Sequence, residues 1–308
     1  MAKKVKDPGF GYGSFKNAKK IINEDGSSNV IHINKRRGLE DLYSYLIEIP
    51  WWRFFLFVFL VYTLINIVFS VVYNLIGIEQ ITPSTGNIWR DLLNGFFFSA
   101  QTITTVGYGG IAPQGLMANI IASFQAMIGL MGFSFITGLL YGRFSKPRAS
   151  IKFSKNLIVR DFKEHRAIMF RLMNSRKNMM IEPEVTVTLS ITEPDEKAET
   201  HKRNFYQLKL ERDKIMYLPT MWTIVHELND DSVLSKYSNE ELMQLDAEMY
   251  ILLQYHDEAF SQKLFKIYSY KFSQLKTDVK FVPSFLFDEE GNTILDHDKL
   301  DQLSDQKS

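Results

Sequence analysis

Two long stretches of the chain are apolar and uncharged, and a shorter one lies between them. No charged residue occurs from Phe54 to Ile78 or from Ile111 to Gly142. Because about 20 apolar helical residues span the roughly 30 Å of hydrocarbon in a bilayer, we predict membrane spans over about 54–76 and 117–141. Residues 92–105 are uncharged but too few to cross. We expect them to enter the membrane as part of a half-helix and turn back.

A short amphipathic segment leads into the first span. Asp41 has the residue type expected at a helix N-cap, and apolar residues then recur three and four positions apart until Pro50. The proline ends this helix, which we place over about 41–49. Two tryptophans and Arg53 follow at once, as is typical of a membrane–water interface. We therefore expect the helix to lie flat on the membrane surface.

The pattern changes after residue 149, where short segments alternate between apolar and polar residues. Repeated short strands separated by polar turns are typical of a β-sandwich. One short helix is expected over about 239–247. The predicted strands lie over about 157–160, 167–173, 185–191, 205–210, 222–227, 249–255, 263–269 and 279–281.

The first 36 residues show little periodicity, and we expect them to be loop apart from a short strand near residues 30–33. The glycine-rich run from Gly9 to Gly13 is not expected to bind phosphate, because no strand precedes it and no helix follows it. The chain thus divides into three predicted regions. They are an N-terminal segment with the surface helix (1–50), a membrane pore region (51–148) and a β-sandwich (149–308).

Basic residues are distributed unequally about the two spans. Residues 1–50 contain nine lysines and arginines, whereas the connecting segment 77–116 contains only Arg90. Because positive charge stays on the cytoplasmic side of a membrane, both termini are expected to be cytoplasmic. The first apolar stretch begins too late and is too long for the core of a cleavable signal, so we expect it to remain as a span.

Overall composition mainly excludes classes of function. A net charge of +1 gives no case for nucleic-acid binding, and the absence of cysteine excludes disulfides and thiolate metal sites. The six histidines are scattered without the spacing of a metal site. No glycine motif for nucleotides follows residue 150. We therefore expect neither an enzyme nor a cofactor.

The chemistry of the chain concentrates in one motif after the uncharged half-helix. A potassium ion that enters a bilayer must exchange its water for other oxygens. Backbone carbonyls of residues 105–108 can supply them, and glycines permit the unusual backbone angles that this requires. One strand contributes one carbonyl to each ring of oxygens, so we expect four chains to form the pore. We expect K⁺ to be the ion that it conducts. The motif consists of Thr105, Val106, Gly107, Tyr108 and Gly109.

Residues around the motif are candidates for supporting the pore. The half-helix, expected over about 88–103, points its negative C-terminal end toward the ion path. Gln101 is expected to hold the filter strand by a hydrogen bond, the alternative being a solvated polar residue. Phe133, Thr137 and Tyr141 share one face of the second span, which lines the pore or, alternatively, contacts lipid or the first span. Tyr141 would then form a hydrophobic ring that gates by dewetting. Small residues that permit close packing or bending are Gly129, Gly132 and Gly138.

A group of basic residues, which we call the basic collar, is expected at the inner membrane surface. Such clusters attract anionic lipid headgroups, although the ordinary bias of positive charge toward the cytoplasm would also place them there. The collar consists of Lys35, Arg36, Arg37, Arg53, Arg143, Lys146 and Arg148.

From residue 35 to about residue 300 the chain resembles the prokaryotic inward-rectifier potassium channels of the KirBac type. This resemblance implies a homotetramer in the bacterial inner membrane. It also implies an α+β membrane protein with a two-transmembrane-helix pore, a re-entrant pore helix, a surface "slide" helix and a cytoplasmic immunoglobulin-like β-sandwich. The residues that carry the resemblance are Asp41-Leu42-Tyr43, Thr104 to Gly109, Gly138 to Phe144 with Pro147-Arg148, Phe205 to Leu210 with Arg212, and Trp222-Thr223 with His226.

The resemblance also implies roles for single residues. Tyr141 would lie at the helix-bundle gate, and an apolar Phe133 at the rectification position implies weak block by Mg²⁺ or polyamines. Glu182 and Glu258 would line the cytoplasmic vestibule and concentrate cations. Phosphoinositides would modulate gating, with the sign of their effect left open. The chain departs from the family in Gln101, where members often carry glutamate, and in lacking an arginine shortly after the filter motif.

A non-conducting membrane receptor or scaffold with an immunoglobulin-like domain is the remaining alternative. Such a protein would need neither the half-helix nor the motif at residues 105–109. A measurement of ion flux separates the two classes, because a scaffold conducts nothing.

Overall fold

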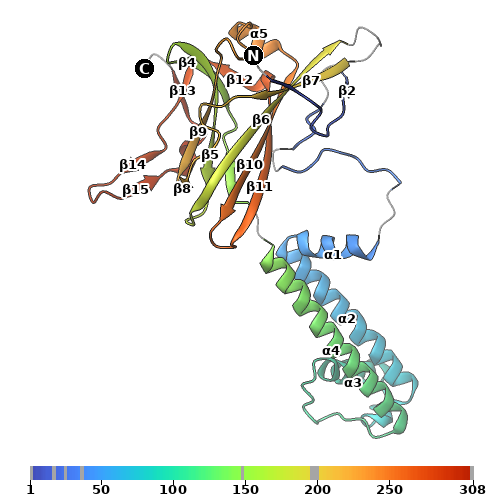
Figure 1. Cartoon of the computed structure of the whole chain (residues 1–308). Helices are drawn as coiled ribbons and strands as arrows, with labels where there is room; N and C mark the ends of the chain where they lie inside the picture. Colours follow the sequence, from blue (N-terminus) through green and yellow to red (C-terminus); the bar gives the residue numbers. More distant parts are fainter. Residues whose placement is uncertain are drawn as a thin grey trace. The chain divides into compact units, whose positions relative to one another are not determined.

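The computed structural model describes residues 3–15, 19–23, 26–34, 38–146, 149–194 and 201–305. Contacts divide the chain into two units (Figure 1). Asn34–Lys146 form the first, which we call the helical unit, and Met1–Ile33 together with Pro147–Ser308 form the second, which we call the β unit. The first 33 residues therefore group with the sandwich, and not with the surface helix as we expected.

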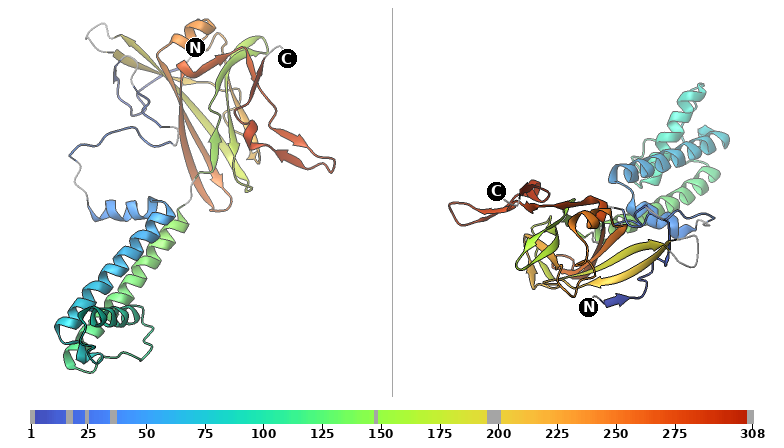
Figure 2. Two further views of the ribbon diagram at one scale, coloured as in Figure 1. Left: turned by 180° about the vertical axis from the view of Figure 1, so that it is seen from behind. Right: turned by 90° about the horizontal axis from the view of Figure 1, so that it is seen from above.

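The helical unit contains the surface helix, both predicted spans and the half-helix between them (Figure 2). Its helices are α1 (Leu39–Glu48), α2 (Trp51–Leu75), α3 (Ile88–Ile103) and α4 (Leu116–Ser145), with a 3₁₀ turn, η1 (Ile78–Gln80), after α2. The helices α2 and α4 have 25 and 30 residues and are apolar and long enough to cross a membrane. Many of their large apolar side chains are exposed, which suits surroundings of lipid or neighbouring helices.

The start of α1 differs from the prediction. Gly38 is the N-cap, and Asp41 is the third residue of the helix. The Oδ2 atom of Asp41 accepts a hydrogen bond from the Gly38 amide at 3.2 Å. A carboxylate at either position satisfies a free amide near the positive end of the helix. The residue type alone therefore did not distinguish the two positions.

The short helix α3 packs tightly against α2. A Cβ atom at Gly95 would lie 3.0 Å from Ser70 Oγ and 3.1 Å from the Ser70 carbonyl oxygen. The absence of a side chain at this position lets the two backbones approach, as small residues do in other membrane helices. The position of α3 relative to α2 is thus set by direct contact along its length.

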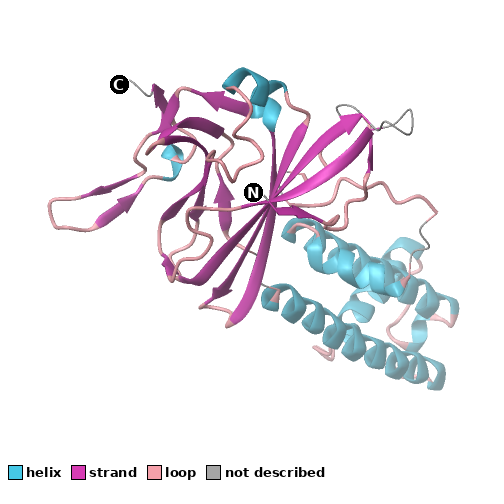
Figure 3. Ribbon diagram, turned by 45° about the horizontal axis from the view of Figure 1, so that its top comes forward, coloured by secondary structure: helices cyan, strands magenta, loops and turns pink. Residues whose placement is uncertain are grey.

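The β unit is built around two large sheets (Figure 3). The first has the order β1-β7-β6-β10-β11, with β2 paired to β7 and β8 paired to β6. The second has the order β12-β4-β5-β3, with β9 paired to β5. Two small sheets, β13-β16 and β14-β15, complete the unit. The strands are β1 (Lys3–Val5), β2 (Gly13–Ser14), β3 (Ile151–Phe153), β4 (Leu157–Phe162), β5 (His165–Asn174), β6 (Met180–Pro194), β7 (His201–Leu208), β8 (Tyr217–Leu218), β9 (Met221–Glu227), β10 (Ala247–Asp257), β11 (Gln262–Lys271), β12 (Leu275–Thr277), β13 (Val279–Phe281), β14 (Phe285–Phe287), β15 (Thr293–Leu295) and β16 (Leu303–Asp305).

The core of the β unit lies between the two large sheets. Alternate residues of the antiparallel pair β6–β10, such as Val187 and Ile251, point inward from the first sheet. Leu172 of β5 and Ile224 of β9 meet them from the second sheet. The predicted β-sandwich is thus confirmed, each predicted strand after residue 149 overlaps an observed one, and the expected short helix is α5 (Asn239–Gln244).

The described part of the N-terminal segment forms two short strands that its sequence did not suggest. β1 and β2 both pair with β7, and the Phe10 ring packs against the Tyr250 ring at a tilt of 31°, with ring centroids 4.3 Å apart. The Asp7 carboxylate accepts hydrogen bonds from the amides of Gly9, Phe10 and Gly11, so these amides are occupied within the chain. No strand forms at residues 30–33, where the prediction was wrong. Strands of two or three residues are too short to show a period in the sequence.

Candidate functional site

The motif at residues 105–109 has an alternating backbone conformation. Thr105, Gly107 and Gly109 have φ angles of 59°, 55° and 83°, in the left-handed region. In an ordinary strand, successive carbonyls point to opposite sides. A left-handed residue at every second position can turn them toward one side. The conformation therefore suits a row of carbonyl oxygens that faces a common axis.

Gln101 clamps the motif to the end of α3. Its backbone carbonyl accepts hydrogen bonds from the amides of Val106 and Gly107, at 3.0 and 3.3 Å. Its side-chain Oε1 accepts from the Tyr108 amide at 3.2 Å, and its Nε2 donates to the Ile111 carbonyl at 3.0 Å. Gln101 thus bonds to three amides within the motif and to the Ile111 carbonyl beyond it, and its side chain is half-buried rather than fully solvated.

Polar side chains anchor the N-terminal end of α3. Asn87 is the N-cap, and its Oδ1 accepts from the Trp89 amide at 2.9 Å. The Asp91 carboxylate accepts hydrogen bonds from the hydroxyls of Ser84 and Thr85, at 2.7 and 2.8 Å. The loop before α3 is therefore tied to the first turn of the helix, which fixes where α3 begins.

The loop that follows the motif is tied to η1. The Gln80 carbonyl accepts from the Gln114 amide at 2.7 Å. The side chain of Gln80 donates to the Ile76 carbonyl at 2.6 Å and accepts from the Ala118 amide at 3.3 Å. The loop that leads into α3 and the loop that follows the motif are therefore both held by hydrogen bonds within the helical unit.

The candidate residues of α4 fall into two groups. Phe133, Thr137 and Tyr141 are exposed in the single chain. The exposed fraction is 71% for Phe133 and 74% for Tyr141. Gly129 is buried, and a Cβ atom at this position would overlap the carbonyl oxygen of Ile103 at the end of α3. Gly132 and Gly138 have open space at the Cβ position, and α4 is a continuous helix through all three glycines.

The structure gives Arg143 of the basic collar an intramolecular role that the sequence did not predict. Its guanidinium donates to the carbonyls of Leu46 and Ile49, at 2.5 and 2.7 Å. It also lies over the ring of Trp51, 4.4 Å from the centroid. A cation that binds the last carbonyls of a helix stabilises its negative end. Arg143 therefore holds the C-terminal end of α1 against α4.

The other members of the collar are exposed or lie outside the described residues. Arg53 contacts the Trp52 ring at 5.1 Å. Lys146 forms an ion pair with Glu48 at 2.6 Å. The side chain of Lys146 is 49% exposed and that of Glu48 is 61% exposed. Such a surface pair contributes about 0–1 kcal/mol. Lys35, Arg36, Arg37 and Arg148 lie outside the described residues.

Glu182 and Glu258 lie at the same end of the β6–β10 pair. The strand register joins Ile181 to His256 and Met180 to Asp257, which places Glu182 near the start of β6, beside the end of β10, where Glu258 follows. Glu182 has a left-handed backbone and pairs with Lys214 at 3.0 Å. Glu258 accepts a hydrogen bond from the Met179 amide at 3.3 Å. The structure therefore brings the two acids to one end of the β6–β10 pair.

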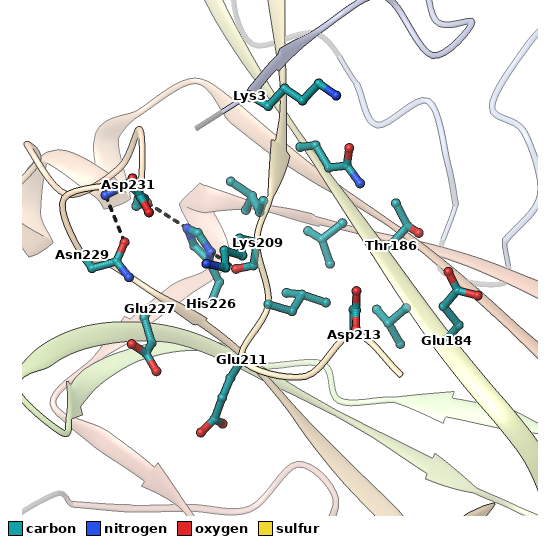
Figure 4. A pocket seen from close by; sticks show the side chains of 16 residues that line it. Lys3, Glu184, Thr186, Lys209, Glu211, Asp213, His226, Glu227, Asn229 and Asp231 are labelled. Carbon is teal, nitrogen blue, oxygen red and sulfur yellow. Dashed lines mark hydrogen bonds between the residues drawn. The ribbon is translucent and has the colours of Figure 1, made fainter. Parts of the chain in front are cut away.

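A cavity of about 750 Å³ opens between β6, β9 and the segment after β7 (Figure 4). His226 is buried beside it, with Nδ1 2.7 Å from the Lys209 carbonyl oxygen and Nε2 2.8 Å from Ser232 Oγ. Burial lowers the pKa of His226 below its ordinary value. Two of the lining acids, Glu211 and Glu227, pair with Lys163. None of the predicted site residues lines this cavity, and no cluster suited to a metal occurs among the described residues.

Several residues that shape the site were missed in the sequence. They are buried polar side chains on α2, α3 and α4, together with Gln80 and the cap formed by Arg143. A signal did exist, because a polar residue inside an otherwise apolar span is rare and usually has a partner. The sequence does not show which residue that partner is. The buried polar residues are Asn66, Ser70, Tyr73, Asp91, Ser99 and Gln125.

Comparisons with known proteins cover nearly the whole chain. Residues 151–307 match the family described as inward rectifier potassium channel C-terminal domain, and residues 54–146 match the family described as ion channel. The chain is 30% identical to the inward rectifier potassium channel Kirbac3.1 of Paramagnetospirillum magnetotacticum, over 92% of this chain and 96% of that one. It is 25% identical to the human G protein-activated inward rectifier potassium channel 4, over 86% of this chain and 68% of that one. It is also 25% identical to the ATP-sensitive inward rectifier potassium channel 12 of Gallus gallus, over 94% of this chain and 73% of that one.

Proposed function

Because this chain belongs to the inward rectifier potassium channel family, we propose that four copies form a pore that conducts K⁺ passively and opens and closes at a cytoplasmic helix bundle. The family consists of ion channels, and K⁺ is the permeant ion. In the proposed tetramer, residues 105–108 of four chains supply the carbonyl oxygens that replace the hydration of the ion. The chain would lie in the bacterial inner membrane with both termini in the cytoplasm, as the basic residues before α2 suggest.

The observation that carries the proposal is the backbone of the motif. Residues 105, 107 and 109 have left-handed φ angles. Thr105 is not a glycine, and the left-handed region costs a residue with a Cβ atom about 1–2 kcal/mol. The hydrogen bonds that Gln101 accepts from the amides of residues 106–108 support this conformation. In this proposal Thr105 adds a hydroxyl to the innermost ring. Val106 and Tyr108, exposed at 53% and 85% in the single chain, brace the strand against neighbouring subunits.

Flux through reconstituted protein tests the proposal. Purified protein in liposomes loaded with KCl should take up rubidium, and the uptake should be blocked by barium and unaffected by a large excess of sodium. A receptor or scaffold of the same fold would show no barium-sensitive uptake. A monomer in size-exclusion chromatography, or equal permeation of sodium and potassium, would contradict the proposal.

Tyr141 would form the narrowest hydrophobic ring of the closed pore. Its side chain is 74% exposed in the single chain, on the same side of α4 as Phe133 and Thr137. A ring of this kind closes a pore by excluding water. Replacing Tyr141 by alanine should therefore raise the open probability about fivefold or more in planar-bilayer recordings. A wild-type or lower open probability in the variant would reject this gate.

Anionic lipids such as phosphoinositides would modulate the channel through the basic collar. Each lysine or arginine near an anionic surface contributes about 1 kcal/mol of attraction. Neutralising Arg53, Lys146 and Arg148 together by glutamine should shift the half-effective phosphoinositide concentration at least about tenfold. Lys276→Gln, which removes an exposed charge from the β unit, is the matched control. An unchanged dose response in the triple variant would count against the collar. Arg143→Gln is kept separate, because it should also loosen α1.

The remaining candidate residues would tune conduction. Gly129, Gly132 and Gly138 would allow α4 to pack closely or to bend. Glu182 and Glu258 would concentrate cations in the cytoplasmic vestibule, with the pair between Glu182 and Lys214 weakening the field of the first. An apolar Phe133 in the pore would give little attraction to Mg²⁺ or polyamines, so block by these cations is expected to be weak.

A further inference from the structure

Buried polar side chains join the three long elements of the helical unit behind the motif. Asn66 and Tyr73 come from α2, Ser99 comes from α3, and Gln125 comes from α4; each is 0% exposed. Figures 1 and 2 show α3 lying beside α2 and α4. We call these four residues the interhelical network.

The hydrogen bonds of the interhelical network run in one direction. The Tyr73 hydroxyl donates to Gln125 Oε1 at 2.7 Å. Gln125 Nε2 donates to Ser99 Oγ at 2.6 Å and to the Ser99 carbonyl at 3.0 Å. Ser99 Oγ then donates to Asn66 Oδ1 at 2.6 Å. Asn66 closes the chain by donating from Nδ2 to the Tyr62 carbonyl at 2.8 Å.

Each hydroxyl in this series has one acceptor and Gln125 Nε2 has two, both on Ser99, so the orientation of the two amides is determined by their neighbours. A hydroxyl carries one proton, and those of Tyr73 and Ser99 are both committed. Buried polar groups of this kind are costly when a partner is removed, because nothing in an apolar region can replace it. The series therefore resists rotation or sliding of α3 relative to the two spans.

Ser99 lies two residues before Gln101, which accepts hydrogen bonds from the amides of residues 106–108. A displacement of α3 at Ser99 would move the Gln101 carbonyl and side chain with it, since both belong to the same helix. We propose that Gln125, acting through Ser99, is a positioning residue for ion selectivity: it sets the depth and rotation of α3 and thereby the ring of carbonyls at residues 105–108. The inference rests on the proposed potassium conduction.

Three variants test the inference in the reconstituted full-length protein. Gln125→Met keeps the length of the side chain and removes its hydrogen bonds to α2 and α3. Ser99→Ala removes one hydroxyl and adds no volume, so it decides the question if Gln125→Met fails to assemble. Tyr73→Phe removes only the bond to Oε1 and leaves both bonds from Gln125 to Ser99. Ser123→Ala is the matched control on α4, because the Ser123 hydroxyl donates to the Asn119 carbonyl of its own helix at 2.8 Å.

The permeability ratio of K⁺ to Na⁺ is the deciding measurement, with the thermal midpoint of the tetramer recorded beside it. We expect Gln125→Met to lower the ratio about tenfold, equivalent to about 1.4 kcal/mol, and Ser99→Ala to lower it about threefold. Tyr73→Phe and Ser123→Ala should stay within about twofold of the wild type. A lower thermal midpoint with a wild-type ratio in both Gln125→Met and Ser99→Ala would overturn the inference, because the network would then only stabilise the fold. Failure of the wild-type protein itself to select K⁺ would instead overturn the proposed function.

Discussion

Replacing Gly107 by alanine is expected to abolish potassium flux. Gly107 has a φ angle of 55°, and a residue with a Cβ atom in this region costs about 1–2 kcal/mol. Four copies meet in the proposed pore, so the conducting conformation would lose roughly 4–8 kcal/mol per tetramer. Within the single chain no atom lies within 4 Å of the Cβ position. The effect would thus come from the backbone and from crowding where the four strands meet.

Rubidium uptake into liposomes measures this effect. Gly110→Ala is the matched control, because Gly110 follows the motif directly, has open space at the Cβ position and no positive φ angle. The control should conduct, and both variants should run as tetramers in size-exclusion chromatography. Potassium-selective uptake at the wild-type rate by Gly107→Ala would show that residue 107 does not need the left-handed conformation.

Replacing Gly129 by alanine is expected to destabilise the helical unit and reduce flux. The added Cβ would overlap the backbone carbonyl oxygen of Ile103, which cannot rotate away as a flexible side chain could. Overpacking of this kind costs about 1–3 kcal/mol per chain. The displaced contact lies at the end of α3, directly before the motif, so the carbonyl ring would be disturbed as well.

Two glycines of the same helix serve as controls for this second experiment. Gly132 and Gly138 have no atom within 4 Å of the Cβ position. Because alanine favours a helix over glycine by about 1 kcal/mol, Gly132→Ala and Gly138→Ala should retain or raise the thermal midpoint of the tetramer. A midpoint for Gly129→Ala equal to that of the two controls would contradict the close contact between α4 and α3.

Much of the fold was predictable because local patterns carry it. The spans at α2 and α4 follow from uncharged apolar runs, and the half-helix follows from a run too short to cross. The strands of the sandwich follow from alternation along segments of several residues. The N-terminal strands β1 and β2 were missed because they are too short to show a period, and they form only where β7 offers an edge.

In the site, too, the sequence predicted the role of some residues, whereas the contacts of others became visible only in the structure. Gln101 was predicted to hold the filter strand, and the structure shows bonds from its side chain to the Tyr108 amide and the Ile111 carbonyl. Arg143 was predicted, with the rest of the collar, either to attract lipid headgroups or to reflect the ordinary bias of positive charge. Its guanidinium donates to the carbonyls at the end of α1, and a count of charges along the chain does not reveal that pairing. Lipid binding by the collar stays a prediction.

The sequence by itself determined the two spans, the half-helix, the motif at residues 105–109 and the class of the β domain. Each of these depends on residues that are close together in the chain or on a regular period. Only the tertiary structure decided that Gln125 bonds to Ser99, that Gly129 lies against Ile103 and that the first residues belong to the β unit. These contacts join residues 26 or more positions apart, and their partners are chosen by packing rather than by local pattern.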